Sequence, residues 1–219
     1  DNGKDYLPYI EGKTNTPMPL FVKPKHKLSV QDVKDMMRDH YEGTPLDISN
    51  DFGAGPYKTP YRLSPLNFKV DGQEYFNERP ISTQQSGFVF VAQMRAHKPD
   101  PIGGVLWFGV DDANMAVFTP VYCCATKVPV CYTRVDGADY ITFSWNSAFW
   151  IFNWVSNMVY PRYDLMIGDV REAQKEMETT FNNAQEGIEE MAAKLYKYDR
   201  TEHFRYLETI GYILDCEVQ

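Results

Sequence analysis

GFVFVAQM (residues 87–94), GVLWFGV (residues 104–110) and AVFTPVY (residues 116–122) are three apolar stretches joined by short connections, and they decide the fold class. Aromatic and β-branched residues dominate them, which is typical of β-strands. Sequential strands with connections this short favour an antiparallel meander. Because their apolar character is nearly continuous rather than alternating, we expect the sheet to be covered on both faces.

After residue 143 the spacing becomes helical. Residues 144–158 leave little polar face and predict a buried helix. From residue 164 to 198, apolar residues recur every three or four positions, which predicts an amphipathic helix of about 35 residues. Residues 201–214 predict a closing helix. Met177 and Met191 are expected to fill the core. The acids of the long helix are expected to form a solvated face: Glu172, Glu176, Glu178, Glu186, Glu189 and Glu190.

The segment before the strands contains less regular structure. Residues 1–27 are expected to be extended or loop, with one short strand at residues 19–22. Ser29 is a candidate N-cap for a helix over residues 30–41. Two Asp-Gly pairs, at 71–72 and 136–137, each predict the turn of a hairpin. The strands of these hairpins would be residues 68–70 with 73–76, and 130–135 with 140–143.

This organisation predicts an α+β chain in three parts. Residues 1–27 form a lead-in, residues 28–143 a β-rich portion with one helix, and residues 144–219 a helical segment packed on it.

The charge balance narrows the function classes. The chain has 22 basic and 30 acidic residues, a net charge of −8, so it has no chain-wide electrostatic footprint for nucleic acid or an anionic membrane. No apolar run reaches 18 residues, which excludes a membrane-spanning helix. The chain has four cysteines, and their spacing includes no CxxC motif: Cys123, Cys124, Cys131 and Cys216. We expect buried thiols, with a single disulfide as the alternative.

No common catalytic or cofactor motif is present. The chain lacks GxGxxG, GxxxxGK[ST], HExxH and GxSxG, and its four histidines have no metal-ligand spacing, so no metal and no cofactor is predicted. Asp111-Asp112-Ala113-Asn114 offers oxygens that suit a cation, but a tight turn has the same composition and is the preferred interpretation. The four tryptophans suit a carbohydrate platform, but core packing is favoured.

Three longer stretches carry a family resemblance. They are DHYEGTPLD (residues 39–47), RPISTQQSGFVFVAQMR (residues 79–95) and PDPIGGVLWFGVDDANMAVFTPVY (residues 99–122). Together they resemble the C-terminal half of the dipeptidase A family of cysteine peptidases, which are N-terminal-nucleophile (Ntn) hydrolases. The resemblance extends over about residues 25–165, and the helical tail carries no signature.

The resemblance implies a fold and a reaction. The fold would be part of an Ntn-hydrolase αββα sandwich, two antiparallel sheets between helices, followed by the long helical segment. The reaction would be hydrolysis of dipeptides or short peptides through an acyl-enzyme, without a metal. A cysteine exposed at a new N-terminus by processing would be the nucleophile, with its own α-amino group as the base.

The sequence departs from this family pattern at its start. Residue 1 is Asp1 rather than Cys, and the chain is about half of family length. We therefore expect a C-terminal portion that is inactive alone, with no catalytic residue in this chain. None of the four cysteines is expected to be the nucleophile, because each lies inside the chain and has no free α-amino group.

The substrate-binding residues are expected in the polar segment around the first central strand. Arg79 is the first candidate for a clamp on a peptide carboxylate and Arg95 the second, because a guanidinium binds a carboxylate through two parallel hydrogen bonds. Ser82, Gln84 and Ser86 are candidate hydrogen-bonding groups at the edge of the site.

The expected partners are a peptide substrate and the N-terminal half of the same precursor, with a second copy of the chain as an alternative. Two other functions stay open: a non-catalytic binding module on the same scaffold, and an Ntn acyltransferase part. The resemblance fits a bacterial periplasmic or secreted enzyme and a cytoplasmic one equally, so the compartment is left open.

Overall fold

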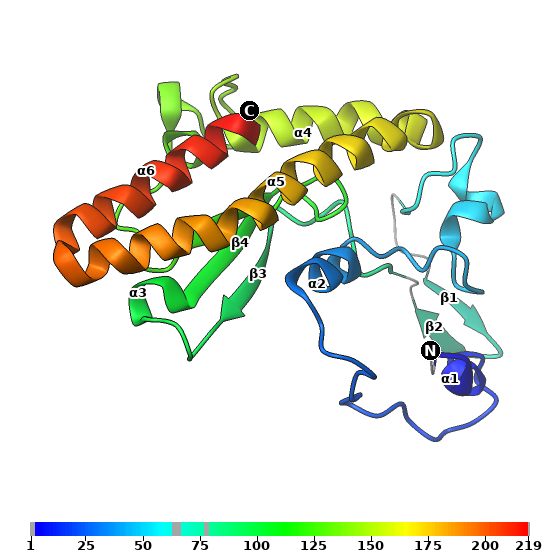
Figure 1. Ribbon diagram of the computed structural model, residues 1–219. Coiled ribbons are helices and arrows are strands. Elements are labelled where there is room, and N and C mark those ends of the chain that lie inside the picture. The colour runs from blue at the N-terminus through cyan, green and yellow to red at the C-terminus, as the bar shows by residue number, and fades with distance from the viewer. Residues whose placement is uncertain (1–2, 63–66, 77–78, 219) are drawn as a thin grey trace.

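The computed structural model describes residues 3–62, 67–76 and 79–218, and it shows a mixed α+β chain (Figure 1). A three-stranded sheet lies at the centre, and a separate two-stranded hairpin forms a second, smaller sheet. The strands are β1 (Asn67–Val70), β2 (Gln73–Phe76), β3 (Phe88–Met94), β4 (Gly104–Val110) and β5 (Thr119–Tyr122). The α-helices are α1 (Gly3–Ile10), α2 (Val30–Met37), α3 (Asp100–Gly103), α4 (Ala148–Val159), α5 (Tyr163–Tyr198) and α6 (Arg200–Val218).

The central sheet has the order β3-β4-β5, and both pairings are antiparallel, which confirms the predicted meander. The register pairs Phe88 with Val110 at one end of β3 and Met94 with Gly104 at the other. The third strand is shorter than predicted and begins at Thr119. The predicted hairpin around Asp71-Gly72 is confirmed as β1 and β2.

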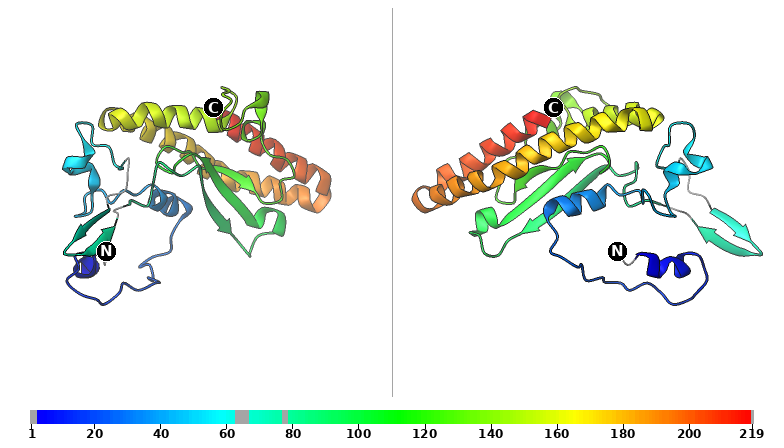
Figure 2. Two further views of the ribbon diagram at one scale, coloured as in Figure 1. Left: turned by 180° about the vertical axis from the view of Figure 1, so that it is seen from behind. Right: turned by 45° about the vertical axis from the view of Figure 1, so that its right-hand side comes forward.

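The core lies between the sheet and the two last helices. Helices α5 and α6 double back on one another along the sheet (Figures 1 and 2). Val105 and Trp107 of β4 are fully buried in one cluster with Phe118, with Phe181 of α5 and with Leu207 of α6. The predicted long helix and closing helix are thus confirmed, and their apolar faces hold the sheet.

The two faces of β3 differ in exposure. Val89 and Val91 are buried, whereas Phe88 and Phe90 are 62% and 51% exposed. The prediction that the sheet is covered on both faces is therefore confirmed at β4. At β3 it is wrong within this chain, because one face of that strand is exposed. The reason is that β3 is an edge strand whose alternate side chains point away from the α5 and α6 layer.

Several predicted segments need correction. Residues 1–27 are not wholly extended, because α1 forms at residues 3–10, and residues 19–22 form no strand. The helix predicted over residues 30–41 ends at Met37. The predicted buried helix over residues 144–158 begins only at Ala148.

The hairpin predicted at residues 130–143 is also wrong. Its Asp136-Gly137 turn forms with positive φ angles of 53° and 75°, but short 3₁₀ helices, Val130–Tyr132 and Val135–Gly137, replace the strands. The Asp139 carboxylate accepts the backbone amides of Ile141 and Thr142 and so holds a local turn in place of a ladder.

Some side chains expected in the core are exposed. Trp107 is buried as expected, but Trp145 and Trp154 are exposed on and before α4. Met191 is exposed as well, and Cys123 is an exposed thiol rather than a buried one. The side chain of Cys216 lies outside the described part of the chain.

Across the described residues, no helix combines the length and the apolar character that crossing a membrane requires.

Gly109 of β4 leads to the first testable prediction. A Cβ added there would lie 2.9 Å from the Cβ of Ala116 and 3.2 Å from the carbonyl oxygen of Val117, so Gly109→Ala is expected to overpack the sheet. We expect a loss of about 1–3 kcal/mol in the free energy of unfolding, measured by urea denaturation. The control is Gly187→Ala in α5, where a Cβ meets open space and the helix should gain about 1 kcal/mol. Equal effects of the two substitutions would contradict this packing.

Candidate functional site

The three stretches that carry the family resemblance meet at one end of β3. The backbone amide of Ser82 donates to the carbonyl oxygen of Asp39 at 3.1 Å. The amide of Asp111 donates to the carbonyl oxygen of Gly87 at 3.0 Å, just beyond the paired part of β3 and β4. Segments around residues 39, 82 and 111 are thus fixed to one another by main-chain hydrogen bonds.

A groove opens at this junction, with a volume of about 250 Å³. We name it the Ser82 groove. Its walls come from the end of α2, from the segment before β3, from β3 itself and from the turn after β4. They are formed by Met37, Ile81, Ser82, Ser86, Phe88, Val89, Phe90 and Ala113. The groove therefore takes residues from the second and third motif stretches and from the helix just before the first.

Ser82 is the most enclosed polar residue of the Ser82 groove. Its side chain is 2% exposed, and its Oγ has no hydrogen-bond partner among the described residues. A buried hydroxyl without a partner costs about 1–3 kcal/mol. A ligand group that reached this hydroxyl would remove that cost.

Two of the other predicted site residues lie near the Ser82 groove. Ser86 is half-buried in its wall, and its amide donates to the carbonyl oxygen of Thr83. The Gln84 side chain donates to the carbonyl oxygen of Arg62 at 3.3 Å, so it ties down the preceding loop.

The two predicted arginines lie in different surroundings. Arg79 is exposed, and no ion pair joins it to a described residue. Arg95 lies just beyond the opposite end of β3, where it forms an ion pair with Glu189 at 2.6 Å and donates to the carbonyl oxygen of Ile102. The structure therefore separates Arg95 from the Ser82 groove and gives it a partner on α5.

The Asp111–Asn114 segment forms a buried turn behind the groove wall at Ala113. Asp112 accepts the backbone amides of Asn114 and Met115 through Oδ1, and the Tyr160 hydroxyl through Oδ2 at 2.8 Å. Ser156 donates to Asp111 Oδ2. The predicted turn is confirmed, and its carboxylate oxygens bind protein donors. Among the described residues, no group of three or more His, Cys, Asp or Glu side chains is arranged to hold a metal ion.

A buried ion pair between Arg38, which caps the end of α2, and Glu178 of α5 fixes the same wall. Arg38 donates through Nε to the carbonyl oxygen of Ala113 at 3.0 Å, and through Nη2 to Glu178 at 2.5 Å. Glu178 also accepts the backbone amide of Phe118 at 3.0 Å. The long helix thus holds the Ala113 wall through one carboxylate.

The expectation of a solvated acidic face is wrong for Glu178 and Glu189, which are both 2% exposed. Glu178 follows the buried Gln174 by four residues and precedes the buried Phe181 by three, so it lies on the inward face of α5. A polar residue at a position of the apolar stripe of α5 is the feature of the sequence that marks this burial.

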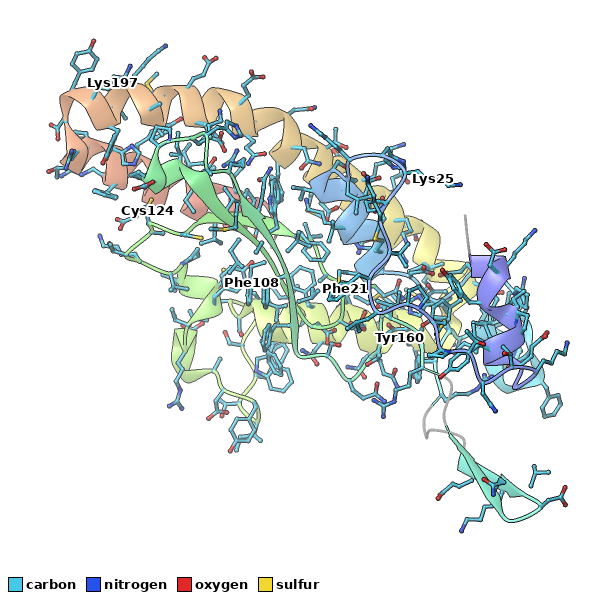
Figure 3. All side chains as sticks on the ribbon, turned by 90° about the horizontal axis from the view of Figure 1, so that it is seen from below. Phe21, Lys25, Phe108, Cys124, Tyr160 and Lys197 are labelled. Carbon is cyan, nitrogen blue, oxygen red and sulfur yellow. The ribbon has the colours of Figure 1, made fainter. Side chains whose placement is uncertain are left out.

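Cys123 and Cys124 follow β5 at the end of the sheet opposite the Ser82 groove. Figure 3 shows Cys124 and Tyr160 at opposite ends of the sheet, and Tyr160 contacts the turn behind the groove wall. The Cys124 thiol is therefore not a group that this groove presents to a ligand.

Asp111 gives a prediction for the dependence of stability on pH. Burial raises the pKa of its carboxyl from 3.8 to about 6, although the Ser156 hydroxyl opposes the shift. Between these two values the folded protein binds more protons than the unfolded chain, so the free energy of unfolding falls as the pH rises from about 4 to about 6. Asp111→Asn should flatten this part of the curve, measured by urea denaturation across that range. Asn also suits the positive φ of 70° at this position. An unchanged slope in the variant would contradict the assignment.

Comparison with known proteins adds independent information. The model of peptidase family C69 matches residues 2–176. Probable dipeptidase B of Lactococcus lactis subsp. lactis (strain IL1403) is 26% identical over 81% of this chain and 35% of its own length. A probable dipeptidase of Latilactobacillus sakei is 25% identical over 67% of this chain and 26% of its own length. Dipeptidase A of Lactobacillus helveticus is 23% identical over 61% of this chain and 23% of its own length. The chain thus spans about a third or less of the length of these relatives.

Proposed function

Because this chain belongs to peptidase family C69, we propose that it forms the substrate-binding portion of a cysteine peptidase that hydrolyses dipeptides or short peptides. The observation that carries the proposal is the family match over residues 2–176, which includes all three motif stretches that meet at the Ser82 groove. The names of the relatives, dipeptidases A and B among them, support the same substrate class.

The proposed reaction proceeds through an acyl-enzyme. A cysteine thiolate adds to the carbonyl carbon of the peptide bond, the amine product leaves with a proton, and water then releases the acid product from the thioester. The cysteine would be the N-terminal residue of its chain, in the part of the relatives' length that these 219 residues do not cover. Its own α-amino group would take the thiol proton.

This chain's own part in the reaction would be to bind and orient the substrate. Ser82 is proposed to pair with the peptide backbone, with Ser86 and Gln84 at the rim. Arg79 is proposed to bind the carboxylate of the substrate, because its guanidinium is exposed and lies only three residues before Ser82, within roughly 11 Å along the chain. Arg95 is not proposed for this role because Glu189 already neutralises it.

The same proposal includes the fold. We propose that the central sheet is one layer of an αββα sandwich, with α5 and α6 as its outer helical layer. A second sheet would then cover the exposed aromatic side of β3, and the Ser82 groove would open at the margin between the layers.

Mapping the nucleophile tests the mechanism. The protein produced from its complete natural gene would be treated with a dipeptide-like electrophile that alkylates catalytic thiols, and the modified residue located by mass spectrometry. We expect the label on an N-terminal cysteine outside the 219 residues described here. A label on Cys123 or Cys124, or none on a folded protein, would overturn the mechanism.

A further inference from the structure

The Ser82 groove combines an apolar wall with one enclosed hydroxyl, and it contains no ionisable side chain among the described residues that line it. Six of its eight lining residues are apolar. Its volume of about 250 Å³ is that of roughly eight water molecules in the liquid, which is room for an amino-acid side chain.

We infer that the Ser82 groove is a subsite for an uncharged, apolar side chain of the peptide substrate, with the Ser82 hydroxyl pairing with the adjacent peptide group. This inference rests on the proposed function and goes beyond it by naming the substrate class. Two independent features of the groove carry it.

The first feature is the composition of the walls. Ile81 and Phe90 are half-exposed apolar residues of the groove wall, and Ala113, which also lines the groove, is buried. A charged side chain that entered would lose hydration and find no counter-charge, whereas an apolar one would leave water for an apolar surface. The groove should therefore discriminate by polarity rather than by charge complementarity.

The second feature is the Ser82 hydroxyl. It is enclosed, lines the groove and has no partner among the described residues, although its own backbone amide is fixed to Asp39. A hydroxyl held in this way can donate to a carbonyl oxygen or accept from an amide. It would thus fix the main chain of the peptide at the point where its side chain enters the groove.

The wild-type experiment compares leucine with asparagine, which have similar shapes and differ in polarity. The protein made from its complete natural gene would be assayed with Ala-Leu, Ala-Asn, Leu-Ala and Asn-Ala. We expect kcat/KM to favour leucine by at least about tenfold at one of the two positions. Equal rates at both positions would overturn the inference.

Two variants locate the preference in the groove. Ile81→Ala should lower kcat/KM for the preferred leucine peptide by about tenfold and for its asparagine counterpart by less than about threefold. Ser82→Ala should lower both by the same factor, about two- to tenfold. Ile141→Ala is the matched control, because Ile141 is exposed and does not line the groove. An equal loss on both peptides in Ile81→Ala would contradict a side-chain subsite.

Two further results distinguish a failure of the subsite from a failure of the proposed function. If Ile81→Ala changed the elution volume of the protein, the groove would be a contact between chains or segments and the inference would be wrong. If the wild-type protein hydrolysed none of the four peptides, the proposed function would fail by itself. Calorimetric titration with the leucine and asparagine peptides would then decide the subsite, and equal or absent binding would overturn it.

Discussion

Replacing Glu178 with alanine is expected to lower the free energy of unfolding by about 3–5 kcal/mol, because it leaves the Arg38 guanidinium buried without its counter-charge. Arg38 would keep its bonds to the carbonyl oxygens of Ala113 and Ala116, but its remaining ion pair would be the 4.0 Å contact with the exposed Asp35 carboxylate. The backbone amide of Phe118 would lose its acceptor as well. The measurement is urea denaturation at pH 7, with the midpoint and the slope compared between variant and wild type.

Glu176→Ala is the matched control, since Glu176 is exposed on the same helix two residues earlier. Its effect should be within about 0.5 kcal/mol. The pH dependence gives a second check. Burial opposes ionisation of Glu178, but Arg38 and Lys34 outweigh it and hold its pKa below 4.5. The stabilisation is therefore present above pH 4.5 and is lost as the pH falls through the lower value. A loss no larger than that of Glu176→Ala would show that this pair does not hold the Ala113 wall.

Replacing Arg79 with alanine is expected to reduce kcat/KM for a dipeptide by roughly 10- to 150-fold. A hydrogen bond to a charged group contributes about 1.5–3 kcal/mol, and this fold-change is the same free energy expressed as a rate ratio. The reason is that the substrate carboxylate would lose its proposed bidentate partner. Arg79 is exposed, so its removal should leave stability nearly unchanged and the loss should appear in catalysis.

The same dipeptide with its carboxylate converted to an amide is the control substrate. Arg79→Ala should change its kcat/KM by less than about threefold, since an amide offers no carboxylate to clamp. Arg79→Lys should recover part of the activity on the free acid, because it restores the charge without the planar fork. An equal loss on the acid and on the amide would place Arg79 outside carboxylate recognition.

The elements that the sequence predicted well are those with a strong local period. The apolar runs that became β3 and β4, and the regular three-to-four spacing of α5, fix their structures through side chains close together in the chain. The hairpin predicted at residues 130–143 does not form. Its turn signals are present, but the Asp139 carboxylate binds backbone amides that a strand ladder would need.

The candidate site was predicted only in part. The density of polar residues before β3 points to Ser82 and Ser86 as substrate-binding candidates, and both line the Ser82 groove. Met37 and Ala113 were missed because they are apolar and far apart in sequence, and only the tertiary structure brings them to Ser82. The burial of Lys34, which does not line the Ser82 groove, is a tertiary feature that the sequence pattern did not predict either. It is fully buried with its Nζ 3.8 Å from the ring centre of Trp107, and burial lowers its pKa to about 8.

Hydrolysis of a free dipeptide is the most direct test of the central claim, that the groove at which the three motif stretches meet is the substrate groove of a cysteine peptidase. The protein produced from its complete natural gene would be incubated with Ala-Leu, and released leucine measured before and after alkylation of its thiols. We expect many leucines to be released per protein molecule before alkylation and none after it. A folded protein that released no amino acid from Ala-Leu or from any dipeptide in a broad panel would contradict it.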